Sequence, residues 1–522
     1  MVSTQDLSLQ PSEGVAFIVE AKDNLDFATL RTQLLRVPGT GENCEIEKLF
    51  ESENGDLTRF AIARFPNADP AISASPFDLA YALTDEADLA SVMPMFVQEP
   101  PVHLAELHPD FAEENDSRHC WPEPYPSDRQ WHLKQMNVPQ AWELSRGKGV
   151  LIGHIDSGVT EQQEIEGSFK IELGKNFVEI DKEPWDVLHK KTDFKWKDQQ
   201  NISGHGTSTC SLAVAHGSGP QEFQGTAPEA YVVPYRAFHS KPIVWQGDAH
   251  KIAKAIEAAS QTCQVISMSL GGFSYFRCIG KAIEEATKKG IICVAAAGNV
   301  LFGNWWVTYP GSDKNCIAVA GTTPDATKWE GSCRGKSVAI SAPATAVYCA
   351  RRNFLNDEFD IVKAGCGGTS YPTACVAGIA ALWLSYHGRD NLINKYRAEN
   401  LTRAFKTILH QTAQRPSGWD TDNFGAGIVD AAALLNAPLP SAQDLVADAA
   451  EEFESFEAQV RCALRERGVA PEKEESIDSE FIQRYGNEIL FLDQYRVQEN
   501  EFAENTPEMS VALKSALAKM ST

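Results

Sequence analysis

The sequence lacks several features that would indicate a membrane protein, a secreted protein or a zinc protein. It has no hydrophobic run long enough to cross a bilayer, and its N-terminal segment lacks the basic start and long apolar stretch of a secretory signal. Its 12 cysteines include no paired CxxC spacing of the kind that holds zinc. We therefore expect a cytoplasmic protein with buried thiols, no disulfide framework and no membrane partner.

Positive charge is also in short supply, since 47 Lys and Arg stand against 71 Asp and Glu, a net charge of -24. This balance argues against a nucleic-acid partner. The excess lies at the two ends: residues 1–128 carry -17, residues 438–522 carry -10, and the residues between them carry +3. Solvated surface explains most of this acidity, and docking of an acidic flank on the near-neutral middle is the alternative.

With 522 residues the chain is long for one domain, and its patterns divide it into four parts. Residues 14–100 alternate strands and amphipathic helices in the order β-α-β-β-α-β, which predicts a small α+β domain. Residues 101–128 are rich in Pro, Glu and Asp and are typical of a linker. Apolar strands alternate with helices over residues 129–437, which predicts an α/β doubly wound, mostly parallel sheet, and residues 438–522 form a helical acidic extension.

A glycine-rich segment, GCGGTSYPTACVAG at residues 365–378, leads directly into an apolar run. It places Ser370 at the start of a predicted buried helix. Backbone N–H groups in a first helical turn are unpaired and lie at the positive end of the helix dipole, which suits a nucleophile whose attack creates an oxyanion. Such turns also cap ordinary helices, so a catalytic interpretation needs a base, an orienting acid and an oxyanion donor elsewhere in the chain.

Three polar residues meet that need. Asp156 ends the strand-like run VLIGHID, His205 lies in SGHGTSTC, and Asn299 follows ICVAAAG. Functional groups of a doubly wound sheet gather at the carboxyl ends of its strands. A serine hydroxyl needs an imidazole base, the base needs a buried carboxylate, and the oxyanion needs donors such as Asn299 and the backbone N–H of Ser370. The four residues predict acyl transfer.

The segments HIDSG, GHGTS, SMSLGG, AAAGN and GGTSYPTACVAG, in this order, closely resemble those of the subtilisin-like serine peptidases (subtilases). The resemblance covers roughly residues 129–437. It implies a serine endopeptidase with Asp156, His205 and Ser370 as its catalytic triad and Asn299 as oxyanion donor.

The same resemblance implies two sets of substrate-binding residues. One set would pair with an extended substrate strand through backbone hydrogen bonds: Ser269, Leu270 and Gly271. The other would line the pocket for the side chain before the scissile bond: Ala295, Ala296, Ala297 and Gly298. Together with Val300, this alanine-rich wall predicts an uncharged residue at that substrate position.

The chain departs from the family at two places. Tyr371–Ala374 replace the usual Met-Ala-x-Pro after the nucleophile, and Ser208 replaces a frequent histidine. Neither change touches a proton-transfer group, so we expect activity. The N-terminal domain more loosely resembles the inhibitory propeptides of this family, which dock on the catalytic domain and pass a tail through its cleft. This implies the chain's own N-terminal domain as a partner in cis, and whether the linker is cut stays open.

Other residues near the motifs have simpler interpretations. His154, two residues before Asp156, is expected to be packed or hydrogen-bonded rather than catalytic. Cys366, four residues before Ser370, is interpreted as a buried structural thiol rather than a redox switch. The acidic residues at 161–186 lack EF-hand-like spacing, so no metal or cofactor is expected, while calcium stays open.

Together these patterns predict a serine endopeptidase that acts on protein or peptide substrates and is regulated by its N-terminal domain. The C-terminal helices offer a surface for a regulatory protein. Two alternatives stay open. One is a protease that a partner activates on one specific protein substrate, and the other is a pseudo-peptidase that uses its cleft to bind peptides.

Overall fold

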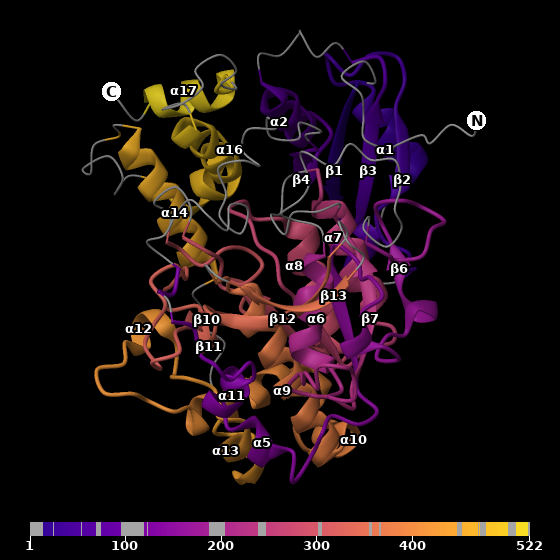
Figure 1. Ribbon diagram of the computed structural model, residues 1–522. Helices are drawn as coiled ribbons and strands as arrows, with labels where there is room; N and C mark the ends of the chain where they lie inside the picture. The colour runs from indigo at the N-terminus through magenta and orange to yellow at the C-terminus, as the bar shows by residue number, and fades with distance from the viewer. Residues whose placement is uncertain are drawn as a thin grey trace.

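The computed structural model describes residues 14–519 apart from 24–25, 54, 69–74, 96–119, 123, 187–203, 239–246, 301–304, 354–357, 365–366, 446–451, 468, 470–476 and 499–507. Three groups of elements are visible in Figure 1: an N-terminal sheet in indigo, a central sheet with its helices, and the C-terminal helices in yellow, which lie on the same side of the molecule as the N-terminal sheet. The expected boundaries at residues 100, 128 and 437 stay a prediction.

The N-terminal unit is a four-stranded antiparallel sheet of order β2-β3-β1-β4 with two helices. Its elements are β1 (Val15–Ala21), α1 (Phe27–Leu34), β2 (Glu45–Lys48), β3 (Phe60–Phe65), α2 (Pro76–Glu86) and β4 (Leu89–Pro94). Side chains of β1 alternate between the two faces of the sheet, so Phe17 and Val19 join the unit's own core while Ile18 faces the rest of the molecule. This is the small α+β arrangement that the sequence predicts.

The central sheet has seven strands, all parallel, in the order β11-β10-β9-β8-β5-β7-β6. The strands are β5 (Leu151–Asp156), β6 (Lys175–Asn176), β7 (Tyr231–Arg236), β8 (Val265–Met268), β9 (Ile292–Ala296), β10 (Cys316–Thr322) and β11 (Val338–Pro343). A parallel sheet must be covered on both faces, and this requirement explains why the strands read as nearly continuous apolar runs.

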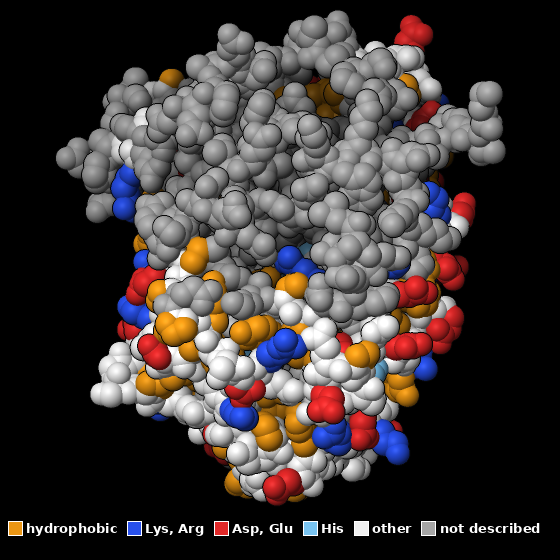
Figure 2. Space-filling view, in the orientation of Figure 1, with side chains coloured by type: hydrophobic (Ala, Val, Ile, Leu, Met, Phe, Trp, Pro, Cys, Tyr) orange, Lys and Arg blue, Asp and Glu red, His pale blue; other side chains and the backbone are white. Residues whose placement is uncertain are grey.

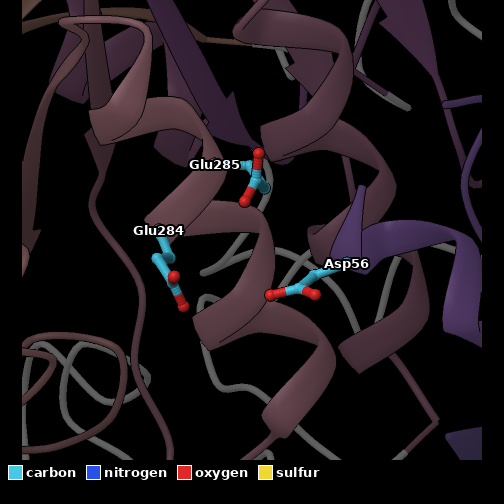
Figure 3. A group of neighbouring side chains, drawn as sticks. All are labelled: Asp56, Glu284 and Glu285. Atoms are coloured by element: carbon cyan, nitrogen blue, oxygen red, sulfur yellow. The ribbon is translucent and has the colours of Figure 1, made fainter. Parts of the chain in front are cut away.

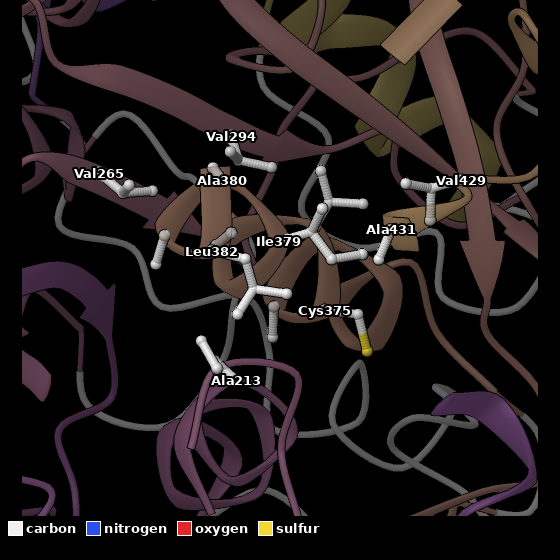
Figure 4. Packing of buried hydrophobic residues seen from close by; sticks show 14 of the residues in the cluster. Ala213, Val265, Val294, Cys375, Ile379, Ala380, Leu382, Val429 and Ala431 are labelled. Atoms are coloured by element: carbon white, nitrogen blue, oxygen red, sulfur yellow. The ribbon is translucent and has the colours of Figure 1, made fainter. Parts of the chain in front are cut away.

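Two hydrophobic cores lie on opposite faces of this sheet. Ile152 of β5 belongs to the core with α6 (His205–Val214) and α9 (Ser370–His387), whereas Ile155 belongs to the core with α7 (Ala249–Ala259) and α8 (Arg277–Lys288). The first fifteen residues of α9 are all buried, and Figure 4 shows its side chains packed among those of strands and neighbouring helices. A helix that is apolar all round belongs in a core, and this one carries Ser370 at its start.

Other helices among the described residues complete the central unit. They are α4 (Trp131–Gln135), α5 (Val138–Ala141), α10 (Arg389–Tyr396), α11 (Leu401–Thr412), α12 (Thr421–Phe424) and α13 (Ala431–Asn436). Helix α11 packs in the same core as α6 and α9. An antiparallel hairpin, β12 (Val347–Asn353) with β13 (Glu358–Ala364), lies outside the main sheet. Three C-terminal helices follow: α14 (Glu452–Glu466), α16 (Ser479–Gln498) and α17 (Val511–Lys519). The doubly wound fold with a helical extension is therefore confirmed.

The cysteines differ from expectation at one position. Ten of them are free thiols, and nine of these are buried, as expected for small apolar side chains. Cys120, however, is disulfide-bonded. The expectation of buried free thiols therefore does not hold at Cys120, while Cys366 lies outside the described residues.

The face drawn in Figure 2 carries charged side chains of both signs. Figure 2 shows acidic and basic side chains interspersed over the described part of that face, as the near-neutral balance of the middle region predicts. Among the described residues, no helix combines the length and apolar character that a membrane crossing requires.

Candidate active site

Three elements of the central unit bring the expected triad residues to one edge of the sheet. Asp156 is the last residue of β5, His205 is the first residue of α6, and Ser370 is the first residue of α9. Nδ1 of His205 lies 2.8 Å and 3.0 Å from the two carboxylate oxygens of Asp156. Because an ionised carboxylate only accepts hydrogen bonds, Nδ1 carries the proton and Nε2 is left as the basic atom of the ring.

Asp156 is fully buried and receives several hydrogen bonds. Ser157 donates its backbone N–H to one oxygen at 2.7 Å, and the hydroxyl of Thr209 approaches the other at 3.4 Å. Burial by itself raises the pKa of Asp156, but the charge and hydrogen bond of His205, with help from His154 and the Ser157 N–H, hold that pKa below its usual value. The carboxylate is therefore ionised and orients the imidazole ring.

His154 packs behind the pair. Its Nε2 atom lies 3.0 Å from the hydroxyl of Thr209 and 3.5 Å from Asp156, and the side chain is buried. Burial lowers the pKa of His154, which keeps it neutral. His154 is a packed, hydrogen-bonded residue that supports Asp156 together with Thr209.

A second buried carboxylate, Asp186, supports the turn that carries His205. One of its oxygens accepts from the hydroxyl of Ser157 at 2.7 Å and from the backbone N–H of Gly204 at 3.1 Å. The Ser157 hydroxyl in turn accepts from the N–H of Gly206 at 3.3 Å. The residue after Asp156 is thus tied to both glycines that flank His205. Sequence reasoning assigned no role to Thr209, although it lies in the His205 segment SGHGTSTC, and it treated Asp186 only as part of the acidic stretch 161–186.

The close approach of the β5 end to α6 requires glycine at position 206. A Cβ atom there would lie 2.1 Å from the carbonyl oxygen of Gly158 and 3.1 Å from a carboxylate oxygen of Asp156. No side chain fits at these distances, so the glycine allows the base and the acid to meet.

Ser370 is buried, and its hydroxyl donates to the carbonyl oxygen of Ser269 at 3.3 Å. Asn299 reaches the same helix start from the loop after β9. Its Oδ1 atom accepts from the backbone N–H of Thr369 at 2.9 Å and from the Thr369 hydroxyl at 3.0 Å. These bonds orient the amide, and its nitrogen, which can donate to an oxyanion, lies on the other side of the side chain. Thr369 is a positioning residue that the motif reading did not identify.

The two predicted substrate-binding segments lie next to each other because they follow neighbouring parallel strands. Ser269–Gly271 continue β8, and Ala297 and Gly298 continue β9. Thr308 lies between them: a Cβ at Gly271 would lie 2.2 Å from its hydroxyl, and one at Gly298 would lie 2.6 Å from its methyl group. A buried threonine therefore separates the two segments.

The alanines of the second segment differ in what they contact. The side chains of Ala295 and Ala297 belong to hydrophobic core clusters, and both residues are fully buried, while Ala296 is 3% exposed. Gly298 is partly exposed. The role of all four residues in a substrate pocket stays a prediction.

One group of three carboxylates among the described residues is close enough to share a cation. Asp56, from the N-terminal unit, faces Glu284 and Glu285 of α8 in Figure 3. Two ammonium groups already lie among them, however. Nζ of Lys281 is 3.3 Å from Asp56 and 2.7 Å from Glu284, and Nζ of Lys288 is 2.8 Å from Glu284 and 2.7 Å from Glu285. The cluster is an ion-pair network between the N-terminal unit and α8.

Comparison with known proteins identifies relatives of the central unit. The model of the subtilase family (peptidase S8) matches residues 147–430. Thermitase of Thermoactinomyces vulgaris is 33% identical over 301 residues, which cover 57% of this chain and 93% of thermitase. An extracellular protease of Xanthomonas campestris pv. campestris is 26% identical over 389 residues, which cover 68% of this chain and 63% of that protein.

Among solved structures, the serine protease MycP1, an essential component of the type VII (ESX-1) secretion system, shares 21% identity with a TM-score of 0.47. The alignment covers 61% of this chain and 91% of that one. The family match spans more than half of the sequence and includes all the expected triad positions. The protein is a subtilisin-like serine endopeptidase, a hydrolase that acts on protein or peptide substrates. The chain belongs to the subtilase family.

Proposed function

We propose that Ser370 is the nucleophile, His205 its general base and Asp156 the residue that orients and charges the base. The hydrogen bonds between His205 Nδ1 and the buried Asp156 carboxylate are the observation that carries this proposal. In the acylation step, the Ser370 hydroxyl turns from the Ser269 carbonyl toward Nε2 of His205 and transfers its proton as Oγ attacks the scissile carbonyl carbon. The imidazolium then protonates the leaving amine, and water hydrolyses the acyl-enzyme by the reverse transfer.

The oxyanion formed in both steps is stabilised by the side-chain amide of Asn299 and the backbone N–H of Ser370. The bonds from Thr369 to Asn299 Oδ1 support this assignment, because they hold the amide beside the start of α9 before substrate arrives. Such preorganised donors require no rearrangement when charge develops. An intact Asp–His pair also argues against the pseudo-peptidase alternative.

We further propose that the N-terminal unit regulates this activity by docking on α7 and α8. Ile18, Phe50 and Phe60 share a core with residues of those helices. Glu257 of α7 accepts from the backbone N–H groups of Glu51 at 3.0 Å and Ser52 at 2.8 Å. These contacts hold the unit on the catalytic unit, and this docking supports the proposed autoinhibition.

An ion pair between Glu20 and Arg277 also joins the N-terminal unit to α8. Glu20, which is fully buried, pairs with Arg277 of α8 and with Arg59 of its own unit. A buried carboxylate is costly without partners, so Arg277 of α8 helps Arg59 to stabilise Glu20.

Thr308 supports the expected preference for an uncharged residue before the scissile bond. Its uncharged side chain lies between Gly271 and Gly298 of the two predicted binding segments. Cleavage of a peptide library should favour small or apolar residues at that position, and replacing Thr308 with glycine should shift the preference toward larger ones. A preference for Lys or Arg would contradict this assignment.

Two observations bear on the cellular compartment of the protein. Its relative from Xanthomonas campestris is named an extracellular protease, and Cys120 is disulfide-bonded, whereas the cytoplasmic expectation rested on the N-terminal sequence. Disulfides persist in oxidising compartments. We propose that the protein resides in a compartment that permits a disulfide. The test is to fractionate the producing cells and to label the free thiols of the captured protein.

The catalytic proposal is tested by comparing the full chain with its Ser370→Ala variant. Both are followed by intact mass and then treated with a fluorophosphonate that labels activated serines. Loss of an N-terminal fragment from the wild type alone would indicate self-processing. Labelling that requires Ser370, with an uncut chain, would indicate a competent site that awaits a substrate or a partner. A wild type that is neither cut nor labelled, even after the N-terminal unit is removed by limited proteolysis, would contradict the proposal.

A further inference from the structure

The C-terminal helices contact the N-terminal unit along α2, and this helix has two separate apolar faces. Ala80 and Leu83 belong to the core of the N-terminal unit. Phe77 and Tyr81 belong instead to a cluster formed with α14, α16 and α17. The Phe77 ring lies 5.6 Å from that of Phe491, measured between centroids. The face that carries Phe77 and Tyr81 is therefore covered by residues that lie about 400 positions away in the chain.

Directional polar contacts reinforce this interface. The Tyr81 hydroxyl donates to the buried carboxylate of Glu488 at 2.9 Å. Arg484 donates to both oxygens of Asp85, at 2.8 Å and 2.6 Å, and its guanidinium lies over the Tyr81 ring. A bidentate arginine–carboxylate pair fixes relative orientation as well as contact. Asp78 of α2, in addition, accepts from the first backbone N–H groups of α17.

The same C-terminal helices also grip the catalytic unit. Asn487, the residue before Glu488, accepts from the backbone N–H of Tyr275 and donates to its carbonyl oxygen, each at 2.9 Å. Gln459 of α14 donates to the carbonyl oxygen of Val307 at 3.3 Å. Tyr275 comes shortly after Ser269–Gly271, and Val307 precedes Thr308. The helices therefore hold both chain segments that extend from the predicted substrate-binding residues.

We infer that α14, α16 and α17 form a clamp that holds the N-terminal unit on the catalytic unit independently of the linker. Asn487 binds the catalytic unit and its neighbour Glu488 binds the N-terminal unit, so one turn of α16 joins the two. The N-terminal and C-terminal regions carry net charges of -17 and -10, and the clamp holds them together through apolar burial and the Arg484 pair despite this like charge.

The clamp gives the N-terminal unit a second attachment besides α7 and α8. A unit held on two sides remains bound after the linker is cut. The clamp itself does not depend on the proposed function, but its consequence does: the bound unit continues to inhibit the protease. The partner of the C-terminal helices is then the chain's own N-terminal unit, and activation requires the clamp to open.

The test measures how fast the N-terminal unit leaves. A cleavage sequence for a site-specific protease is inserted between residues 100 and 119 of the full chain, in a Ser370→Ala background that makes the result independent of catalysis. After the cut, dissociation of a dye-labelled N-terminal fragment is followed against excess unlabelled fragment. We expect slow release from the parent, and release about tenfold faster from Tyr81→Ala and from Arg484→Asp.

Charge reversal provides the decisive comparison, because it uses exposed residues and leaves both cores intact. Adding Asp85→Arg to Arg484→Asp restores a pair of opposite charges and should restore slow release. Glu86→Ala on α2 and Glu480→Arg on α16 change exposed residues of the same helices and serve as controls that should release like the parent. Release from Arg484→Asp at a rate within twofold of the parent's, or no recovery in the double variant, would overturn the clamp.

A second experiment uses the active chain. There Arg484→Asp should also speed the labelling of the protein by a fluorophosphonate. If release becomes faster but labelling does not, the clamp stands and the inhibitory role is contradicted.

Discussion

Ser269 and Ser370 bond each other reciprocally. The Ser269 hydroxyl donates to the carbonyl oxygen of Ser370 at 2.9 Å, and the Ser370 hydroxyl donates to the carbonyl oxygen of Ser269 at 3.3 Å. The pair ties the end of β8 to the start of α9. The hydroxyl of Ser370, the proposed nucleophile, thus donates to the carbonyl of the first residue in the predicted substrate-binding segment, and this bond must break before the hydroxyl can turn toward His205.

Replacing Ser269 with alanine should remove one half of this pair and loosen the start of α9. We expect kcat to fall about fivefold with little change in KM, since a hydrogen bond of this kind contributes about 1 kcal/mol. Steady-state cleavage of a peptide substrate measures the effect. Ser260→Ala, a buried serine of the loop after α7, is the matched control and should leave kcat unchanged. Equal losses in both variants would show a general loss of stability instead.

Replacing Asn299 with aspartate should separate positioning from donation. The aspartate keeps an oxygen that can accept from Thr369 but has no N–H to offer an oxyanion. We expect kcat to fall by about 10² to 10³, as for other side-chain oxyanion donors, with the fold retained. Thr369→Val, which removes the hydroxyl contacts to Asn299 and to the Gly298 N–H but leaves the Asn299 amide in place, should cost less. A larger loss in Thr369→Val than in Asn299→Asp would contradict the donor role.

Asp156→Asn should lower kcat by about 10⁴-fold, because an amide in this position permits the wrong tautomer of His205.

The same substitution should also alter the stability of the protein in acid. The pKa of Asp156 is lowered in the folded protein, so its ionisation stabilises the fold above about pH 4, and this contribution is lost as pH falls through the lower folded value. Urea unfolding from pH 7 to pH 3 should show a wild-type advantage that shrinks only in acid. An advantage that is constant over this range would contradict the linkage.

The clamp should be tighter in mild acid than at neutral pH. Burial raises the pKa of Glu488, with Asp78 adding to the increase, while the hydrogen bonds from Ser510 and Tyr81 oppose it. Protonated Glu488 stabilises the bound N-terminal unit. This contribution is fully present below about pH 4 and is lost as the pH rises through the raised pKa of Glu488 in the closed clamp. Release of the N-terminal fragment should therefore be slower at pH 5 than at pH 7.5.

Glu488→Gln tests this assignment, since it should remove most of the difference between the two pH values. Arg484 holds the pKa of Asp85 below its ordinary value, so that pair stays ionised throughout this range and does not contribute. A pH dependence that persists unchanged in Glu488→Gln would show that another group is responsible.

The sequence predicts those site residues that lie in recognisable local motifs. Asp156 follows an apolar strand, and His205 and Ser370 each begin a helix, so their positions on the elements follow from hydrophobic pattern and glycine placement. Thr209, Asp186 and Thr369 were missed because nothing in their local sequence indicates which distant group they contact. The run AVYCA at residues 346–350 predicts a strand, and this strand is part of β12, whereas its pairing with β13 outside the main sheet was not predicted.

The sequence by itself determined the order of strands and helices, the parallel sheet and the chemistry at its edge, because periodicity and motif spacing act over a few residues. Only the tertiary structure decided that Ser370 bonds Ser269, that Cys120 is disulfide-bonded, and that α2 shares its second face with helices near the other end of the chain. The reason is physical. An amphipathic helix shows that one of its faces must be buried, whereas the partner that covers this face depends on shape and distance across the whole fold.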